Sequence, residues 1–211
     1  MNFESVLRPE SRDTILKFYE TYEPNYVYFD RFKTVPPFAV KNLFYGDSIT
    51  AGFPLHDLFP GRSIINRALP GDTPTGLYLR LEQDLFAFTP QRVFMMCGIN
   101  GIECGVKQVF AELSAVAGMI QERGSEVYLC SILPIRYPDK YNRFQYQEDI
   151  CQVNAALRDH AAKNGMGYLD YHAAVRDEKG ELAAEYARPD GTHITAAGYL
   201  RMSRVVAPYL L

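Results

Sequence analysis

The sequence predicts an α/β fold of three layers, in which a central parallel sheet of about five strands carries helices on both faces. Three observations predict it. From about residue 40 onward, short apolar runs alternate with longer segments of helical periodicity. The apolar runs are nearly continuous, as in strands that are covered on both faces. Glycine, proline or asparagine bounds most of these segments.

Five apolar runs of strand length predict the strands, and turn residues mark where they end. The runs span residues 40–45, 63–68, 92–97, 127–133 and 168–171. Gly46 follows the first run, Gly98 the third and Pro134 the fourth. Glycine and proline interrupt regular strands, so these residues mark the carboxyl ends of the predicted strands.

Five segments with helical spacing predict the helices. They span residues 9–22, 73–86, 103–123, 144–163 and 195–211. Thr73 is the expected cap of the second helix, because the proline after it suits the first helical position. Gly124 follows the third helix and Gly165 the fourth, and glycine is a typical helix stop.

The chain is expected to divide into an N-terminal helical and aromatic extension, residues 1–39, and one α/β domain, residues 40–211. The stretch from Tyr22 to Phe38 is rich in tyrosine and phenylalanine, which is not typical of a disordered tail. Two interpretations stay open. The favoured one is a packed arm that covers an edge or face of the sheet, and the other is an aromatic wall for a substrate or a dimer contact.

The composition and charge exclude several classes of function. The net charge of −3 lacks the basic excess of proteins that bind nucleic acid or anionic membranes. No apolar stretch approaches the roughly 20 residues of a membrane-spanning helix. The first residues lack the basic and apolar pattern of a signal peptide. We therefore expect a cytoplasmic protein that binds neither nucleic acid nor a membrane.

The four cysteines form no C-x-x-C pair, and buried thiols are favoured over disulfides or a metal site. They are Cys97, Cys104, Cys130 and Cys151. The sequence also lacks the glycine-rich patterns of dinucleotide and nucleoside triphosphate sites. No metal and no organic cofactor is expected.

Small and polar residues gather at the ends of the predicted strands, where parallel sheets bind their ligands. The four groups are Gly46-Asp47-Ser48, Pro70-Gly71-Asp72, Gly98-Ile99-Asn100-Gly101 and Asp190-Gly191-Thr192-His193. Each group alone is a weak signal, since a Gly-Asp-Ser tripeptide occurs by chance in many proteins. All four together, in this order, indicate an active site at one edge of the sheet.

These groups resemble the sequence blocks of the SGNH/GDSL hydrolase family, in its acetylhydrolase-like branch. The matching segments are residues 44–50, 66–73, 98–100 and 190–193. The resemblance runs from about residue 40 to 205 and implies a flavodoxin-like sheet and serine esterase activity. The chain departs from the pattern at Gly101, where the family usually has aspartate, and at Ala68, where it often has glycine.

Ser48, Asp190 and His193 are the predicted catalytic residues. A serine hydroxyl is a weak nucleophile and needs a neighbouring base. His193 suits this role, because Asp190 three residues earlier can hold one imidazole nitrogen while the other faces Ser48. The competing interpretations are a helix-capping serine, a surface histidine and a turn aspartate. The four blocks together favour catalysis.

The resemblance implies an oxyanion hole made of the backbone N–H groups of Ser48 and Gly71 and the side-chain amide of Asn100. Ser48 falls at a strand-to-helix turn, where unpaired N–H groups favour negative charge. Gly71 has no side chain, so a substrate oxygen can approach its N–H closely. Asp47 is expected to hold the turn or cap the helix and not to act in catalysis.

An O-acetylesterase acting on a carbohydrate is the first functional hypothesis. The segment 66–73 resembles the sugar-esterase branch, and the polar, aromatic loop 136–143 is expected to border the site. A lysophospholipase or acyl-thioesterase is the alternative enzyme. A catalytically silent binding protein on the same fold is the alternative of another class. The expected partner is a small-molecule or saccharide ester, and homo-oligomer formation is left open.

Overall fold

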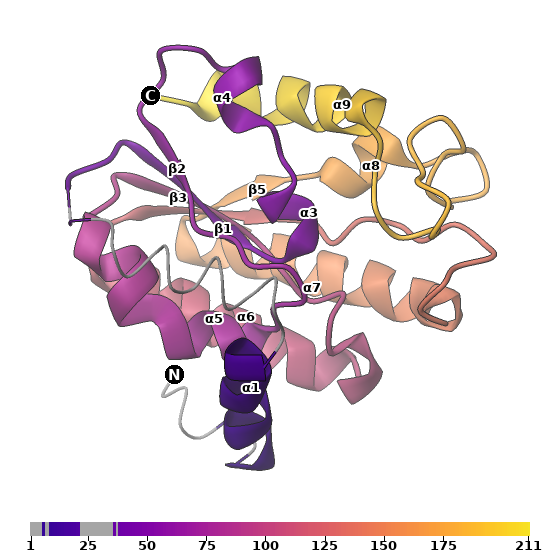
Figure 1. Ribbon diagram of the computed structural model, residues 1–211, viewed down its shortest axis with the longest axis horizontal. Coiled ribbons are helices and arrows are strands. Elements are labelled where there is room, and N and C mark those ends of the chain that lie inside the picture. The colour runs from indigo at the N-terminus through magenta and orange to yellow at the C-terminus, as the bar shows by residue number, and fades with distance from the viewer. Residues whose placement is uncertain (1–5, 7–8, 22–35, 37) are drawn as a thin grey trace.

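The computed structural model describes residues 6, 9–21, 36 and 38–211, and it contains three layers around one parallel sheet (Figure 1). The five strands lie in the order β2-β1-β3-β4-β5. They are β1 Asn42–Gly46, β2 Ile64–Asn66, β3 Arg92–Met96, β4 Glu126–Cys130 and β5 Gly167–Leu169. Every neighbouring pair is parallel. This order is that of a flavodoxin-like sheet, and the predicted fold class is confirmed.

The helices of the described chain cover both faces of the sheet (Figure 1). They are α1 Pro9–Thr21, α3 Ser48–Ala51, α4 Leu55–Leu58, α5 Pro74–Arg80, α6 Val106–Glu122, α7 Gln147–Asn164, α8 Tyr171–Val175 and α9 Ala196–Val206. One core cluster lies under α5, α6 and α7, and a second lies under α3, α4, α8 and α9. Helix α1 packs outside the sheet against α5.

The central strand β1 shows why the strands read as continuous apolar runs. All five of its residues are buried. Phe44 belongs to the core cluster under α9, and its neighbour Tyr45 belongs to the cluster under α5. Successive side chains of a strand point to opposite faces, so both positions must be apolar when both faces are covered.

The predicted helix 73–86 is only partly correct. Thr73 caps it as expected, because its hydroxyl accepts from the N–H of Gly76 over 3.1 Å. The α-helix ends at Arg80 and continues as a π-helical turn, Leu81–Leu85, and a 3₁₀ turn, Phe86–Phe88. Apolar spacing does not reveal this change, because Leu81 and Leu85 stay in the core through the wider turn.

Other boundaries shift by a few residues for local reasons. Gly105, with φ of +90°, separates a 3₁₀ turn from α6, so the predicted start at residue 103 is too early. Asp170 caps α8 by accepting from the N–H of Ala173, which ends the fifth strand before residue 171. Pro208 lacks an N–H group, and α9 gives way to a 3₁₀ turn there.

The extension is described only in part. Helix α1 is confirmed, whereas the two interpretations of the aromatic stretch fall mostly on residues outside the described ranges, and the division at residue 40 stays a prediction. No helix in the described chain is long and apolar enough to cross a membrane. In the described chain the four cysteines form no disulfide; Cys97 and Cys130 are buried, Cys104 is partly buried and Cys151 is exposed.

Candidate active site

The loops that follow β1, β2 and β3 lie side by side at one edge of the sheet. Gly46, the last residue of β1, pairs with Met96, the last residue of β3. The N–H of Leu69, beyond β2, donates to the carbonyl of Gly46 over 2.9 Å. The sheet therefore gathers the first three predicted groups at its carboxyl edge, as expected for parallel strands.

Ser48, His193 and Asp190 form a continuous chain of side-chain hydrogen bonds. The Oγ of Ser48 lies 2.8 Å from Nε2 of His193, and Nδ1 of His193 lies 3.0 Å from Oδ2 of Asp190. Ser48 opens α3 directly after β1, whereas the other two residues come from the loop before α9. The structure thus joins side chains that are as much as 145 residues apart in the sequence.

The proton positions in this chain follow from the charge of Asp190. Burial would raise the pKa of Asp190, but the backbone N–H groups of His193 and Thr192 donate to its Oδ1 and lower the pKa below the ordinary value. An ionised carboxylate only accepts hydrogen bonds, so Nδ1 of His193 carries the proton. In the neutral imidazole Nε2 then accepts from the hydroxyl of Ser48, which is the arrangement that a general base requires.

The loop before α9 is fastened to residues 135–143, the loop after β4. The N–H of Arg136 donates to the carbonyl of Gly191 over 2.8 Å, and the N–H of Lys140 donates to the carbonyl of Asp190 over 2.9 Å. Gly191 has φ of +73°, and a Cβ there would lie 2.4 Å from the carbonyl oxygen of Arg136. Glycine is required at this contact.

Two of the groups predicted to form an oxyanion hole, Gly71 and Asn100, lie next to the backbone of Asp72. Nδ2 of Asn100 donates to the carbonyl oxygen of Asp72 over 2.9 Å, which leaves its second amide hydrogen unused. Gly71 has φ of +78°, a conformation that glycine adopts without strain. Within the described part of the chain, the N–H groups of Ser48 and Gly71 donate no hydrogen bond.

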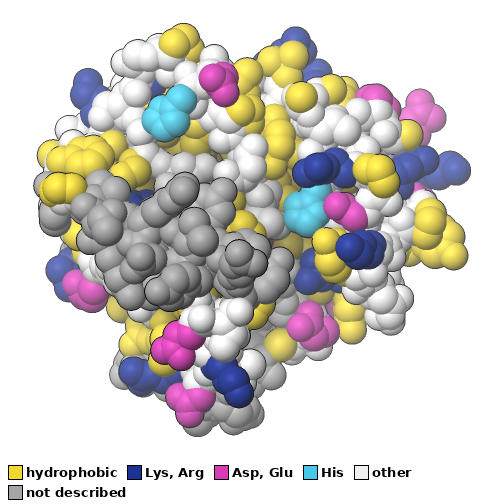
Figure 2. All heavy atoms as spheres, in the orientation of Figure 1, with side chains coloured by type: hydrophobic (Ala, Val, Ile, Leu, Met, Phe, Trp, Pro, Cys, Tyr) yellow, Lys and Arg dark blue, Asp and Glu magenta, His cyan; other side chains and the backbone are white. Residues whose placement is uncertain are grey.

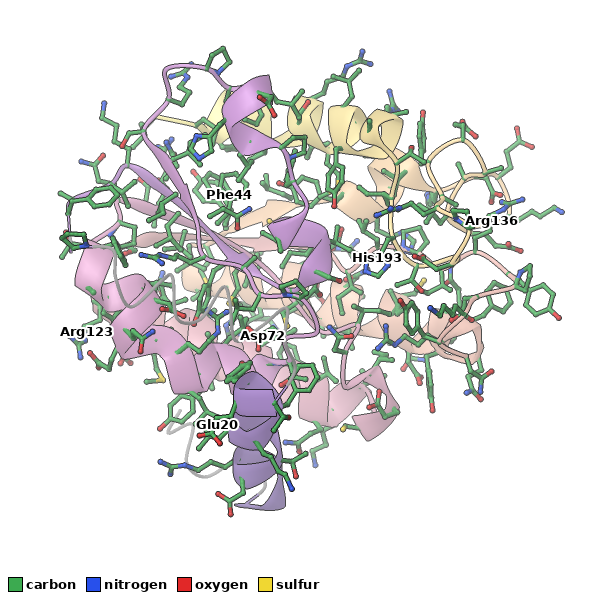
Figure 3. The ribbon with its side chains drawn as sticks, viewed as in Figure 1. Glu20, Phe44, Asp72, Arg123, Arg136 and His193 are labelled. Carbon is green, nitrogen blue, oxygen red and sulfur yellow. The ribbon has the colours of Figure 1, made fainter. Side chains whose placement is uncertain are left out.

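Asp72 belongs to a buried ion pair with Arg80, which also binds Asp84, and the sequence did not predict this cluster. Nη2 of Arg80 lies 2.5 Å from Oδ2 of Asp72, and Nη1 lies 2.6 Å from Oδ2 of Asp84. Burial would lower the pKa of Arg80, but the Asp72 carboxylate, helped by Asp84, raises it well above the ordinary value. Tyr19 of α1 donates its hydroxyl to Asp72, which lies beside this helix in Figure 3. These bonds fix the Gly71–Asp72 turn.

Asp47 has the structural role that the sequence predicted. Its Oδ1 accepts from the N–H of Ile49 over 3.0 Å and so caps α3 just before Ser48. The side chain is 2% exposed. Burial raises the pKa of Asp47 to about 7, although the N–H of Ile49 opposes the shift. Below about pH 7 the capping group in the folded protein is therefore mainly the neutral carboxyl.

Asp47→Asn is expected to weaken the pH dependence of stability. Between pH 4 and pH 7 the folded Asp47 holds a proton that the unfolded chain releases, so the free energy of unfolding falls as pH rises. The contribution is at most about 1.4 kcal/mol per pH unit. Asparagine keeps the capping oxygen and does not titrate. Urea unfolding at pH 5 and pH 8 measures the difference, and equal pH slopes in both proteins would contradict it.

Two side chains of the 135–143 loop contact His193 and Asn100. The sequence had indicated only that this loop borders the site. The Tyr141 ring lies edge-on to the His193 ring with 6.0 Å between centroids, and Tyr141 is 41% exposed. Nη2 of Arg143 donates to Oδ1 of Asn100 over 2.8 Å. Figure 2 shows basic side chains gathered around a histidine on the side where Figure 3 labels His193.

Comparisons with known proteins agree on one family. The model of the GDSL-like lipase/acylhydrolase family matches residues 44–201. A Streptococcus pneumonia structure, described as a candidate platelet activating factor, is 27% identical with a TM-score of 0.76 and 99% coverage of both chains. No protein with a curated description matches significantly.

Two further structures share the fold at lower identity. A candidate acylhydrolase from Bacteroides fragilis is 22% identical with a TM-score of 0.78, over 86% of this chain and 93% of that one. A catalytic mutant of an acetylxylan esterase from Geobacillus stearothermophilus is 19% identical with a TM-score of 0.66, over 82% and 94%. At these identities the likeness shows the fold alone.

Proposed function

Because the chain belongs to the GDSL-like lipase/acylhydrolase family, we propose that it is a serine esterase that removes small acyl groups, O-acetyl groups above all, from a carbohydrate. The resemblance found in the sequence blocks is confirmed at the level of the family. One observation carries the proposal: the hydroxyl of Ser48 lies 2.8 Å from an imidazole nitrogen whose partner nitrogen faces a carboxylate. This is the arrangement that activates a serine.

The proposed reaction proceeds through an acyl-enzyme. Ser48 Oγ attacks the ester carbonyl while Nε2 of His193 takes its proton, and Asp190 stabilises the imidazolium. The negative oxygen is held by the N–H groups of Ser48 and Gly71 and by the amide of Asn100. The tetrahedral adduct expels the alcohol, which receives the proton from His193. Water then repeats the sequence and releases the acid.

The alcohol side of the substrate lies next to the 135–143 loop in this mechanism. The leaving oxygen must come within reach of Nε2 of His193 to receive its proton. Tyr141 packs on that imidazole and keeps a large exposed surface. A flat aromatic surface among polar groups suits the face of a sugar ring better than an acyl chain. The fold shared with an acetylxylan esterase is consistent with this choice.

A second observation favours the alternative of a longer acyl chain. A hollow of about 230 Å³ lies between α1 and the loop after β2. Ile15, Phe18 and Gly71 line it together with Thr14, Tyr19, Asp72 and Thr73. An acyl chain held near Gly71 has room to enter this hollow, as a lysophospholipase or acyl-thioesterase would require.

A series of p-nitrophenyl esters tests the proposal. If the acyl site fits only a small group, as proposed, the acetyl ester is expected to have a kcat/KM at least about tenfold above that of the octanoyl ester. Acetylated xylose and glucose, followed by acetate release, test the alcohol. A preference for octanoyl esters supports the lipase alternative. Failure of a fluorophosphonate to label the protein supports the silent binding protein instead.

A further inference from the structure

The side-chain amide of Asn100 is held at both of its ends. Its Nδ2 donates to the carbonyl oxygen of Asp72 over 2.9 Å, and its Oδ1 accepts from Nη2 of Arg143 over 2.8 Å. The opposite orientation of the amide would place oxygen against oxygen at Asp72 and N–H against N–H at Arg143. The two contacts therefore fix which way the amide faces and where its second hydrogen points.

Arg143 is itself held by the loop that carries it. Its backbone N–H donates to Oδ2 of Asp139 over 2.8 Å, and the next N–H, of Phe144, donates to Oδ1 of the same residue over 2.9 Å. Its guanidinium carbon lies 4.9 Å above the centre of the Tyr141 ring. The Asp139 carboxylate thus holds the backbone of Arg143, and the Tyr141 ring packs against its guanidinium.

A cation on the amide oxygen changes the amide as a donor. A hydrogen bond from a charged group is roughly twice as strong as a neutral one, and bonds in a chain polarise one another. Electron density drawn toward Oδ1 makes the Nδ2 hydrogens more acidic. The unused hydrogen then binds a negative oxygen better than a neutral carbonyl, which is the preference that accelerates a reaction.

We propose that Arg143 is a positioning residue that orients and polarises the amide of Asn100 for the oxyanion, and does not itself bind the substrate. The inference rests on the proposed esterase function. Arg143 stabilises the developing charge through Asn100, and with that amide removed it has no route by which to act. This dependence on a second residue separates the role from simple substrate binding.

A double-mutant cycle on p-nitrophenyl acetate hydrolysis tests the inference. Asn100→Ala is expected to lower kcat about 10²- to 10³-fold. Arg143→Gln is expected to lower kcat about 10- to 100-fold with little change in KM. In the Asn100→Ala background, Arg143→Gln should change kcat by less than about threefold, because the two residues act as a unit. Arg143→Lys keeps the cation and should recover part of kcat.

Arg158→Gln is the control for the loss of one positive charge. Arg158 belongs to α7, is exposed, and its guanidinium lies 3.9 Å from the carboxylate of its neighbour Asp159. The Arg158→Gln variant should keep the wild-type kcat. Equal losses from Arg143→Gln in both backgrounds, or a loss confined to KM, would overturn the inference. If Arg143→Gln does not fold, Arg143→Lys is measured in both backgrounds against the same criterion.

The same data separate this inference from the proposed function. If the wild-type protein does not hydrolyse the ester, or if Asn100→Ala is as active as wild type, the proposed mechanism fails. If Asn100→Ala loses activity while Arg143→Gln acts independently of it, the mechanism stands and only the inference on Arg143 is wrong.

Discussion

Ser48→Ala is expected to lower kcat for p-nitrophenyl acetate by about a million-fold and to leave the fold intact. In the proposed mechanism the Oγ of Ser48 is the atom that forms the bond to the acyl group, and alanine offers no replacement. Losses of this size are typical of removing the nucleophile from a group of residues that act together. The substitution leaves the cap of α3 in place, because the side chain of Asp47 makes it.

Activity, labelling and folding are measured together for this variant. A fluorophosphonate should label the wild-type protein and not Ser48→Ala, while circular dichroism and the midpoint of thermal unfolding stay the same. Ser203→Ala is the control, because within the described residues the hydroxyl of Ser203 donates only to the carbonyl of Leu200 in its own helix. Continued labelling or normal turnover after Ser48→Ala would refute Ser48 as the nucleophile.

Of the substitutions proposed, Arg80→Met should destabilise the fold most. It should lower the free energy of unfolding at pH 8 by about 3–5 kcal/mol. The change leaves the carboxylates of Asp72 and Asp84 buried without their cation. Burial raises the pKa of Asp72, and loss of Arg80, which opposes this shift, will raise it further. The folded variant therefore binds a proton at Asp72 more tightly than the unfolded chain, so the loss should be smaller at pH 5.

Urea unfolding at both pH values measures this effect. Arg123→Met is the matched control, because the ion pair of Arg123 with Glu82 is exposed on both sides. Its removal should cost less than about 1 kcal/mol. Equal losses from the two substitutions would mean that the buried pair contributes no more than a surface pair. Arg80→Met should also lower kcat, since Asp72 carries the carbonyl that holds Asn100.

The grouping of residues at the strand ends could be predicted from the sequence, because the strands of the sheet are parallel. Continuous apolar runs identify strands, and the carboxyl ends of parallel strands meet at one edge. Ser48, Gly71 and Asn100 each follow such a run, so their grouping needed no knowledge of side-chain geometry. The pairing of Ser48 with His193 depended on the resemblance of the sequence blocks, because loop conformation sets their 2.8 Å contact.

The contacts that sequence reasoning missed join residues with no periodic relation. Arg143 reaches Asn100 across 43 positions and Tyr19 reaches Asp72 across 53, so neither pair leaves a pattern in a single sequence. Arg80 and Asp84 are four residues apart, a spacing that often marks a helical ion pair. That spacing was a usable signal, but it is more often found on a solvated face than in a core.

The short helices were missed for a different reason. Helix α4 has four residues and α8 has five, which is less than two turns of apolar periodicity. The π-helical turn after Arg80 keeps the same side chains in the core as an α-helix would. Boundaries of this kind depend on caps and packing, as at Asp170, and not on the hydrophobic pattern.

The bonds between the 135–143 loop and the loop of Asp190 limit how this enzyme can acquire new substrates. In the proposed mechanism, insertions near Arg136 or Lys140 would shift the carboxylate that orients the imidazole, so variants that accept new alcohols through such insertions are expected to lose turnover. Ile15 and Phe18 of α1 line the hollow beside Gly71 instead. Random libraries at Ile15 and Phe18 should therefore yield active variants with altered acyl preference more often than libraries in the loop.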